Sequence, residues 1–248
     1  MWALPLLAAL VAAVFAGFLA REYVGSRRPY QGVWAISLAM YAVASLAVVA
    51  GAANGWSRSE FEVYWALGAV LNVPFLAAGE VLLLFRQRWV CWLTVGVLIF
   101  VTALTFSTLS GATYDPAALA ETLPSGKHVF GAGTPAHQLP QLISIPSYLL
   151  LLAGALWSAW TMRGHAELRD RFVGTLLIAL GATITAVGGS AFAALGKLAL
   201  FSLTLLAGIS TMFAGFLRAG RQAAASQAGS PGPDGSDPSG STVTSSRS

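Results

Sequence analysis

Glu80 is the acidic residue that lies well inside an apolar stretch of this 248-residue chain. The nearest charged residue, Arg86, follows six positions later, which is roughly 9 Å along a helix. An ionisable side chain at such a depth in a membrane is costly unless it is paired, protonated or facing water, and it therefore indicates function. A carboxyl group there can bind a cation or carry a proton. The structural alternative is a neutral acid that is hydrogen-bonded to a neighbouring helix.

Two further polar residues lie on the same face of this helix. Steps of four residues define one ridge along it. The ridge consists of Tyr64, Gly68, Asn72, Leu76 and Glu80. Asn72 lies near the middle of the span, so the ridge can line a polar path. We take Tyr64, Asn72 and Glu80 as a candidate intramembrane polar site, and we expect Glu80 to be buried, neutral and hydrogen-bonded to one of the last three spans.

Other residue types that bind metals or attack substrates do not form a recognisable set. His128 and His137 lie nine positions apart in a polar segment, which fits no compact zinc motif. Cys91 is the single cysteine, so an intramolecular disulfide and a CxxC site are excluded. We therefore expect no catalytic residues, no metal and no cofactor, and we do not favour an enzyme.

The composition indicates which elements must hold these residues. Charged residues make up 10% of the chain and hydrophobic residues 56%, whereas soluble domains carry about 25% charged residues. Seven apolar stretches of about 19 to 23 residues separate the charges, and a helix of that length crosses roughly 30 Å of hydrocarbon. The sequence therefore predicts an all-α integral membrane protein, a bundle of seven transmembrane helices.

The seven helices are expected within one domain that covers residues 1–218. Their expected bounds are Trp2–Ala20, Val33–Ala53, Glu62–Phe85, Trp89–Leu109, Leu142–Met162, Phe172–Gly189 and Leu198–Leu217. Seven-helix rhodopsins bind retinal through a lysine of the bundle, and Lys197 is the lysine of the last stretch. It lies at the outer start of that stretch and is expected to extend toward the headgroups, which argues against a retinal Schiff base in the middle of the bundle.

Two segments are expected outside the bundle. Residues 110–141 should form an extracytoplasmic loop, in which Asp115-Pro116 predicts the start of a short helix. Leu119 and Leu123 are expected to rest on the membrane surface. Residues 219–248 are rich in Ser, Gly and Pro and poor in large apolar residues, so they should form a disordered cytoplasmic tail.

The positions of basic residues predict the orientation. If the N-terminus lies outside, all of the 14 Lys and Arg residues except Arg58, Lys127 and Lys197 fall on the cytoplasmic side, where positive charge is retained. The tryptophans cluster near the ends of the expected spans, as they do at membrane interfaces. The excess of Arg over Lys, with many Ala and Gly, indicates a bacterium and so its inner or plasma membrane. We expect the N-terminus outside and the C-terminus in the cytoplasm.

Small residues repeat at four-residue spacing in three of the expected helices. The repeats are Ala9, Ala13 and Gly17; Gly181, Thr185, Gly189 and Ala193; and Ala207, Thr211 and Gly215. Such residues allow helix backbones to approach closely. They predict packing either within the chain or against a membrane-protein partner or a second copy. The basic residues form no continuous face, so the bilayer rather than nucleic acid is the expected surroundings.

These observations leave two functions open. The first is a non-enzymatic membrane component that packs with or regulates a partner, as the small-residue repeats and the lack of a catalytic set indicate. The alternative is a small-solute or proton-linked transporter with a site around Glu80 and Asn72. The two differ in whether the ridge from Tyr64 to Glu80 faces an interior cavity or packs without one.

Overall fold

Residues 2–85, 87–163 and 169–228 are described in a computed structural model, and they form helices and short connections without a strand. Seven helices are long and apolar enough to span a membrane. They cover Ala3–Ser26, Pro29–Asn54, Arg58–Leu84, Arg88–Ser110, Pro135–Met162, Phe172–Ala194 and Leu198–Arg218, and are called spans 1 to 7. The predicted all-α class is confirmed, and so is the predicted number of seven helices that are able to span a membrane within the described residues.

Four of the spans are uninterrupted α-helices, and three contain a π-helical segment. The uninterrupted ones are α1 (Ala3–Ser26), α2 (Pro29–Asn54), α5 (Arg88–Ser110) and α11 (Leu198–Ala228), of which α11 contains span 7. Span 3 joins α3 (Arg58–Val63), η1 (Tyr64–Leu71) and α4 (Asn72–Leu84). Span 5 joins α7 (Pro135–Leu139), η3 (Pro140–Ser144) and α8 (Ile145–Met162). Span 6 joins α9 (Arg169–Thr183), η5 (Ile184–Gly188) and α10 (Gly189–Ala194).

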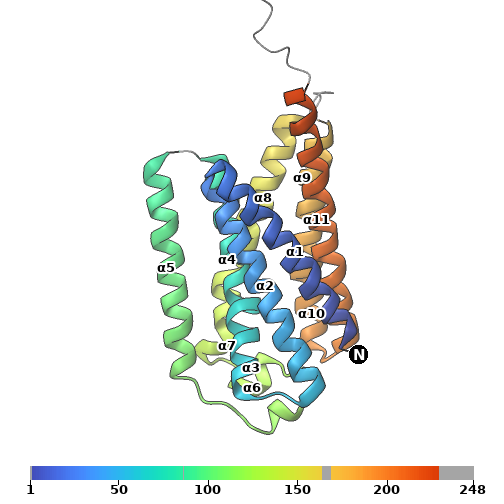
Figure 1. The fold of residues 1–248 in the computed structure, drawn as a ribbon. Coiled ribbons are helices and arrows are strands. Elements are labelled where there is room, and N and C mark those ends of the chain that lie inside the picture. The colour runs from blue at the N-terminus through green and yellow to red at the C-terminus, as the bar shows by residue number, and fades with distance from the viewer. Residues whose placement is uncertain (1, 86, 164–168, 229–248) are drawn as a thin grey trace, which may run out of the picture.

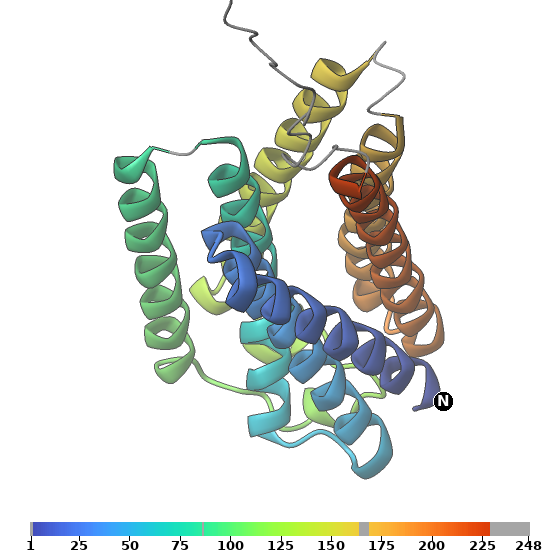
Figure 2. The same ribbon diagram turned by 45° about the horizontal axis from the view of Figure 1, so that its top comes forward.

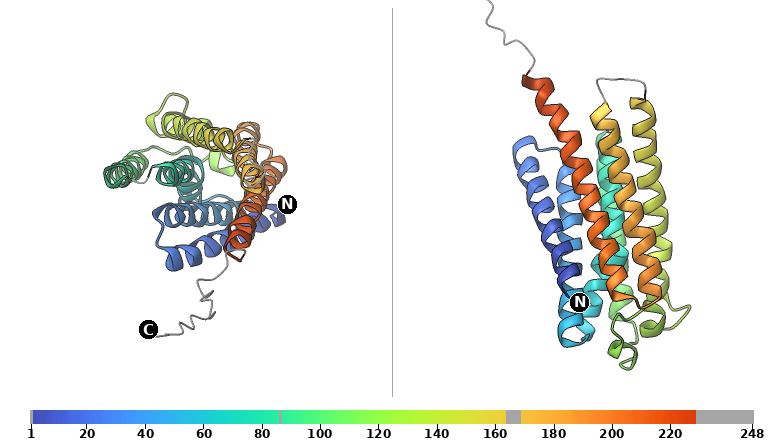
Figure 3. Two further views of the ribbon diagram at one scale, coloured as in Figure 1. Left: turned by 90° about the horizontal axis from the view of Figure 1, so that it is seen from above. Right: turned by 90° about the vertical axis from the view of Figure 1, so that its right-hand side faces the viewer.

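Six of the spans form a closed ring, and the remaining one lies outside it. In the ring each helix packs against the next, in the order α1, α2, α4, α8, α9, α11 and back to α1. Helix α1 packs against both α2 and α11 (Figure 2). Helix α5 packs beside α4 at the edge of the molecule (Figures 1 and 3). The ring leaves an interior that several helices can line together.

The two ends of the bundle differ in what they carry. One end, which we call the loop end, holds the N-terminus, α3, α7 and the segment 111–134 (Figure 1). The other, which we call the arginine end, holds the short connections after α1 and α4 and the last turns of α11 (Figure 1). Arg27, Arg28 and Arg88 lie in or beside these connections, and Arg163 follows the last residue of α8 at the same end.

Span 5 begins seven residues earlier than the sequence predicted, at Pro135 instead of Leu142. The hydroxyl of Thr134 accepts a hydrogen bond from the backbone N–H of His137 at 3.4 Å and so caps the new start. Pro135 occupies the first turn, where a missing N–H costs nothing. The expected loop 110–141 therefore ends at Thr134.

Helix α11 continues to Ala228, so the first ten residues of the expected disordered tail are helical. The run Ala223-Ala224-Ala225 explains this extension, because alanine has the highest helix propensity. The rest of the predicted tail, residues 229–248, lies outside the described residues.

The small residues of spans 6 and 7 pack against each other. A Cβ atom on Gly181 would lie 2.5 Å from the carbonyl oxygen of Gly208, and one on Gly215 would lie 2.6 Å from that of Gly174. These repeats therefore bring two helices of the same chain together. In α1, by contrast, a Cβ atom on Gly17 would meet no atom within 4 Å.

The segment 111–134, which we call the cap, folds onto the loop end of the bundle. It contains a single 3₁₀ turn, η2 (Ala118–Ala120), and the short helix α6 (Gly126–Phe130). Asp115 accepts a hydrogen bond from the N–H of Ala117 at 2.9 Å, yet the chain turns instead of starting a longer helix there. Leu123 is only 1% exposed and Leu119 packs against the core, so the prediction that both rest on the membrane surface is wrong.

Candidate functional site

A cavity of about 640 Å³ lies inside the ring, in its loop-end half. Spans 2, 3, 5, 6 and 7 and the cap line it, and most of the lining side chains are apolar. Pockets for small molecules are typically about 300–1,000 Å³ in volume and mainly apolar. The cavity therefore has the size and the wall of a small-molecule site.

The floor of the cavity consists of four large apolar side chains from four different spans. They are Leu38, Leu76, Leu151 and Met212. The same four side chains also border a much smaller void of about 20 Å³ on their other side. The floor is thus a thin apolar layer that separates the cavity from the arginine end.

The three π-helical segments in the described part of the chain all contribute to the cavity wall. Gly68 lies in η1, Ser144 in η3 and Thr185 in η5. The Ser144 hydroxyl donates to the carbonyl oxygen of Ala69 at 2.8 Å and thereby links span 5 to span 3. A π-helical turn is rare and occurs frequently at functional sites. Three of them around one cavity mark it as the strongest candidate site.

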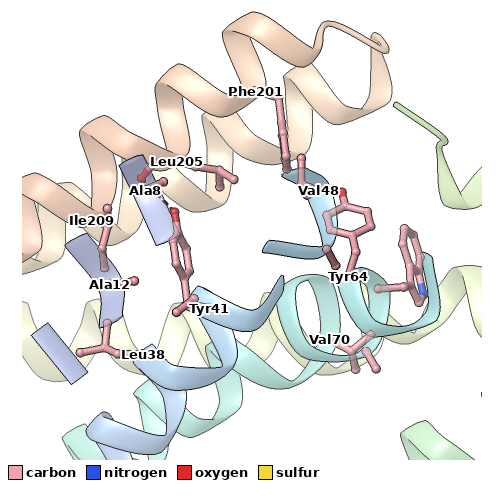
Figure 4. Packing of buried hydrophobic residues seen from close by; sticks show 14 of the residues in the cluster. Ala8, Ala12, Leu38, Tyr41, Val48, Tyr64, Val70, Phe201, Leu205 and Ile209 are labelled. Carbon is pink, nitrogen blue, oxygen red and sulfur yellow. Dashed lines mark hydrogen bonds between the residues drawn. The ribbon is translucent and has the colours of Figure 1, made fainter. Parts of the chain in front are cut away.

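Two tyrosines, from α2 and η1, extend toward α11, as Figure 4 shows. The hydroxyl of Tyr41 donates to the carbonyl oxygen of Leu205 at 2.9 Å. The ring of Tyr64 lies 6.1 Å from that of Phe201, and its hydroxyl has no hydrogen bond within the described residues. Tyr41 therefore holds two helices together, whereas the Tyr64 hydroxyl is available to an occupant.

Asn72 lines the cavity and has one half of its amide free. Its side-chain oxygen accepts a hydrogen bond from the Ser37 hydroxyl at 2.5 Å. Asn72 is 4% exposed, and its amide nitrogen, which can donate two hydrogen bonds, has no partner among the described residues. The structure therefore brings Tyr64 and Asn72 of the predicted polar site to the same cavity.

Glu80, the third residue of the predicted site, does not line the cavity. It is 6% exposed, so its expected burial is confirmed. The expected hydrogen bond to span 5, 6 or 7 is wrong within the described residues, because the neighbouring position on span 5 is Gly154, which has no side chain to offer. A Cβ atom on Gly154 would lie 2.7 Å from the Cγ atom of Glu80. The floor residue Leu76 precedes Glu80 by one helical turn and separates it from the cavity.

Several of the other hydroxyl groups around the cavity already donate within the protein. Thr185 donates to the carbonyl oxygen of Gly181 at 3.1 Å, and Tyr148 donates to the Thr183 hydroxyl at 2.9 Å. These bonds leave an apolar wall with a few free polar atoms. Sequence reasoning missed Tyr41 and Tyr148 as wall residues, although a tyrosine in the middle of an apolar span is itself a signal of an inward-facing position.

Basic side chains border the cavity at its loop end, where Lys127, His128 and His137 lie. His128 is 2.7 Å from Glu121 through its Nδ1 atom. The Nδ1 atom of His137 is buried and has no hydrogen-bond partner among the described residues. The two histidines that the sequence placed in a solvated loop therefore both lie at the rim of the cavity.

An aromatic cluster holds the cap on the bundle. The indole N–H groups of Trp56 and Trp65 donate to the carbonyl oxygens of Thr122 and Ala136, each at 3.1 Å. The ring of Phe130, in α6, lies 5.5 Å from that of Trp65. Trp56 and Trp65 were expected at the membrane interface, but both are buried anchors of the cap.

At the outer side of this cluster, the guanidinium group of Arg58 lies 4.3 Å from the centre of the Tyr114 ring. Burial, together with the nearby carboxylate of Glu62, raises the pKa of the Tyr114 hydroxyl, so its ring is neutral while it contacts Arg58, which also pairs with Glu62 at 2.8 Å. This contact adds a polar tie between span 3 and the cap.

The arrangement can bind a molecule, since it combines a partly open, mainly apolar cavity with a small number of free polar atoms. In the described residues, no group of three or more His, Cys, Asp or Glu side chains could hold a metal ion. The chain matches no protein-family model, no curated protein and no solved structure.

Proposed function

We propose that this protein is a small-solute membrane transporter whose substrate occupies the cavity inside the ring. The observation that supports this proposal is the cavity beside Tyr64 and Asn72, where a purely structural bundle would pack without a void. In transporters, substrate sites lie near the middle of the membrane at interrupted helices. The π-helical segments of spans 3, 5 and 6 are such interruptions.

Tyr64 and Asn72 are the proposed substrate contacts, because the Tyr64 hydroxyl and the Asn72 amide nitrogen border the cavity without a partner in the described chain. If transport is coupled to protons, Glu80 is the proposed proton carrier. It lies beyond the floor, so a proton can pass between its carboxyl group and the cavity when Leu76 and the other floor residues separate. Transport then needs the floor to open toward the arginine end.

The proposal is tested by filling the cavity with a larger side chain. Ala186 of η5 borders it, whereas Ala191 of α10 is exposed and does not. The Ala186→Phe variant should lose the small molecules that copurify with the wild-type protein, as measured by mass spectrometry, and should lose their uptake into proteoliposomes. The Ala191→Phe variant should retain both. Equal retention by the two variants contradicts the proposal.

The second candidate is the membrane component that packs with or regulates a partner. Helix α5 supports it, because this helix lies outside the ring and exposes Trp92, Phe100 and Phe106. In α1, Ala13 and Gly17 also face outward. Native mass spectrometry from lipid nanodiscs tests this candidate: a second copy or a bound membrane protein supports it, and a monomer that still takes up solute excludes it.

The proposed orientation places the N-terminus and the cap outside the cytoplasm and the arginine end inside it. The arginines beside the connections at that end support this orientation, since basic residues are retained on the cytoplasmic side. The proposed location is the cell membrane of a bacterium, which the Arg-, Ala- and Gly-rich composition supports. In this orientation the cavity lies in the outer half of the bundle.

A further inference from the structure

The cavity reaches the surface of the bundle between spans 5 and 6. Ile145 and Val187 both border the cavity, and they are 54% and 59% exposed. Toward the arginine end, the hydrogen bond from Tyr148 to Thr183 joins the same two spans. The opening therefore lies within the membrane-spanning part of the helices, above this bond, where its surroundings are lipid.

The cap covers the loop end of the cavity. Pro124 and Gly126 border the cavity from the cap, and both are buried. A Cβ atom on Gly126 would lie 1.9 Å from the indole ring of Trp65, so the cap rests directly on span 3. The cap is packed at Pro124 and Gly126 but exposed at Lys127 and His128, so a polar headgroup can stay in contact with water at this end while an apolar chain enters through the opening between spans 5 and 6.

The polarity of the wall changes along the cavity. The floor is formed by leucine and methionine side chains. The rim at the loop end carries Lys127, His128, His137 and Gln141, and no described carboxylate borders the cavity anywhere. A molecule with a long apolar part and a negatively charged end matches this gradient, because its charge can lie beside Lys127 while its apolar part extends to the floor.

We infer that the substrate is a single-chain amphiphile with an anionic headgroup, which enters sideways from the bilayer between spans 5 and 6. Its chain fills the cavity down to Leu76, and its headgroup lies beside Lys127. This inference rests on the proposed function and names the substrate class of the same site. It assigns Lys127 a role in selecting the headgroup and Ile145 and Val187 a role in access.

The first experiment tests the headgroup with two probes that share a chain and differ in charge, palmitate and 1-hexadecanol, in nanodiscs. The wild-type protein should bind palmitate more tightly. Lys127→Gln should weaken palmitate binding several-fold and leave 1-hexadecanol binding unchanged. Lys197→Gln is the matched control, because Lys197 is also exposed near the loop end but does not border the cavity. Hexadecyl phosphate then distinguishes a phosphate from a carboxylate headgroup.

The second experiment tests the route. Val187→Trp should slow the binding of membrane-dissolved palmitate several-fold, since the larger side chain narrows the opening. Leu180→Trp is its control, because Leu180 is exposed on the same span and does not border the cavity. The rates are measured after mixing nanodiscs that hold the protein with vesicles that hold radiolabelled palmitate.

The outcomes separate this inference from the proposed function. If Ala186→Phe removes a copurified water-soluble molecule while Val187→Trp and Lys127→Gln change nothing, the inference is wrong and the transporter proposal stands. If neither palmitate nor any copurified molecule responds to Ala186→Phe, both are wrong. Loss of the palmitate preference in Lys127→Gln together with slower binding in Val187→Trp supports the inference.

Discussion

The buried polar side chains of span 3 have different surroundings, and these surroundings give them different roles. Asn72 has a hydrogen bond from Ser37 and a free amide nitrogen on the cavity. Glu80 has neither, since it lies beyond the floor against a glycine of span 5. Burying a polar group without a hydrogen bond costs about 2–7 kcal/mol, depending on the reference state. The carboxyl oxygens of Glu80 are not among the fully buried described atoms that lack a partner, so the side chain avoids part of this cost, and its role as a proton carrier stays part of the proposal.

The contact between Glu80 and Gly154 can be measured with a double-mutant cycle. Gly154→Ala should lower the free energy of unfolding by about 1–3 kcal/mol, because the new methyl group overlaps the Glu80 side chain. Glu80→Ala in the Gly154→Ala background should restore most of this loss. Thermal unfolding in detergent gives the four stabilities. If the changes in the free energy of unfolding caused by the two substitutions simply add, the contact is contradicted.

The two tyrosines of the cavity wall should respond differently to loss of the hydroxyl group. Tyr41→Phe should lower stability by about 0.5–1.5 kcal/mol, because it leaves the Leu205 carbonyl oxygen without its partner. Tyr64→Phe should leave stability unchanged, since its hydroxyl has no described partner, and should weaken substrate binding. Thermal unfolding and ligand binding are measured on both variants. A stability loss in Tyr64→Phe would show that its hydroxyl is already engaged.

For individual residues, the sequence predicted whether a side chain is buried better than it predicted which groups that side chain contacts. The four-residue spacing placed Tyr64, Asn72 and Glu80 on one inward ridge, and all three are buried. It could not separate Glu80 from the cavity, because that separation depends on leucine and methionine side chains that meet from four spans. Such a meeting is a property of the packed molecule and has no signature in one helix.

Among the elements, spans 6 and 7 pack closely together, and glycine residues at their contact permit this approach. A Cβ atom on Gly208 would lie 1.9 Å from the hydroxyl oxygen of Thr185 and 2.8 Å from the carbonyl oxygen of Gly181. Lipid provides no hydrophobic drive for helix association, so close packing of this kind supplies the attraction. The η5 wall of the cavity is positioned by this packing.

The Gly208→Ala variant should therefore be destabilised by about 1–3 kcal/mol, since two helices must separate to admit the methyl group. Gly96→Ala on α5 is the matched control, because a Cβ atom there would meet nothing within 4 Å. Unfolding by denaturing detergent measures both. Equal stability of the two variants would show that the approach of spans 6 and 7 does not depend on Gly208.

Element boundaries were predictable where hydropathy alone sets them and unpredictable where local capping does. Span 4 begins and ends within one residue of its predicted bounds, Trp89–Leu109. Span 5 begins earlier because Thr134 and Pro135 start a helix in a polar segment that a hydropathy window cannot distinguish from a loop. The π-helical segments also lack a hydropathy signal, since they change the backbone and leave the composition unaltered.

For the whole molecule, the ring explains why the chain has an interior to line. Six helices that close on themselves leave a central space, and the cap and the floor close its two ends. Helix α5, outside the ring, adds surface toward the membrane and no wall to the cavity. The molecule is thus a ring of six helices around a cavity, with one further helix outside the ring.

The orientation of the protein in the membrane is tested with fusions to a reporter enzyme that is active only outside the cytoplasm. A fusion after Ser110 should be active, and a fusion after Ala219 should be inactive, because the basic residues at the arginine end favour the cytoplasmic side. Activity is assayed on whole cells, with expression checked by immunoblotting. The reverse pattern would place the cavity in the inner half of the membrane.

The three π-helical segments also make the stiffness of the bundle uneven. A π-helical turn closes its hydrogen bond between residues five apart, one further than in an α-helix, so it interrupts the regular α-helical bonding pattern. Segments η1, η3 and η5 all border the cavity, while the α-helical parts toward the arginine end hold the floor. We expect the wall to adapt to occupants of different thickness by shifts within these segments, whereas release toward the arginine end requires the four floor side chains to separate.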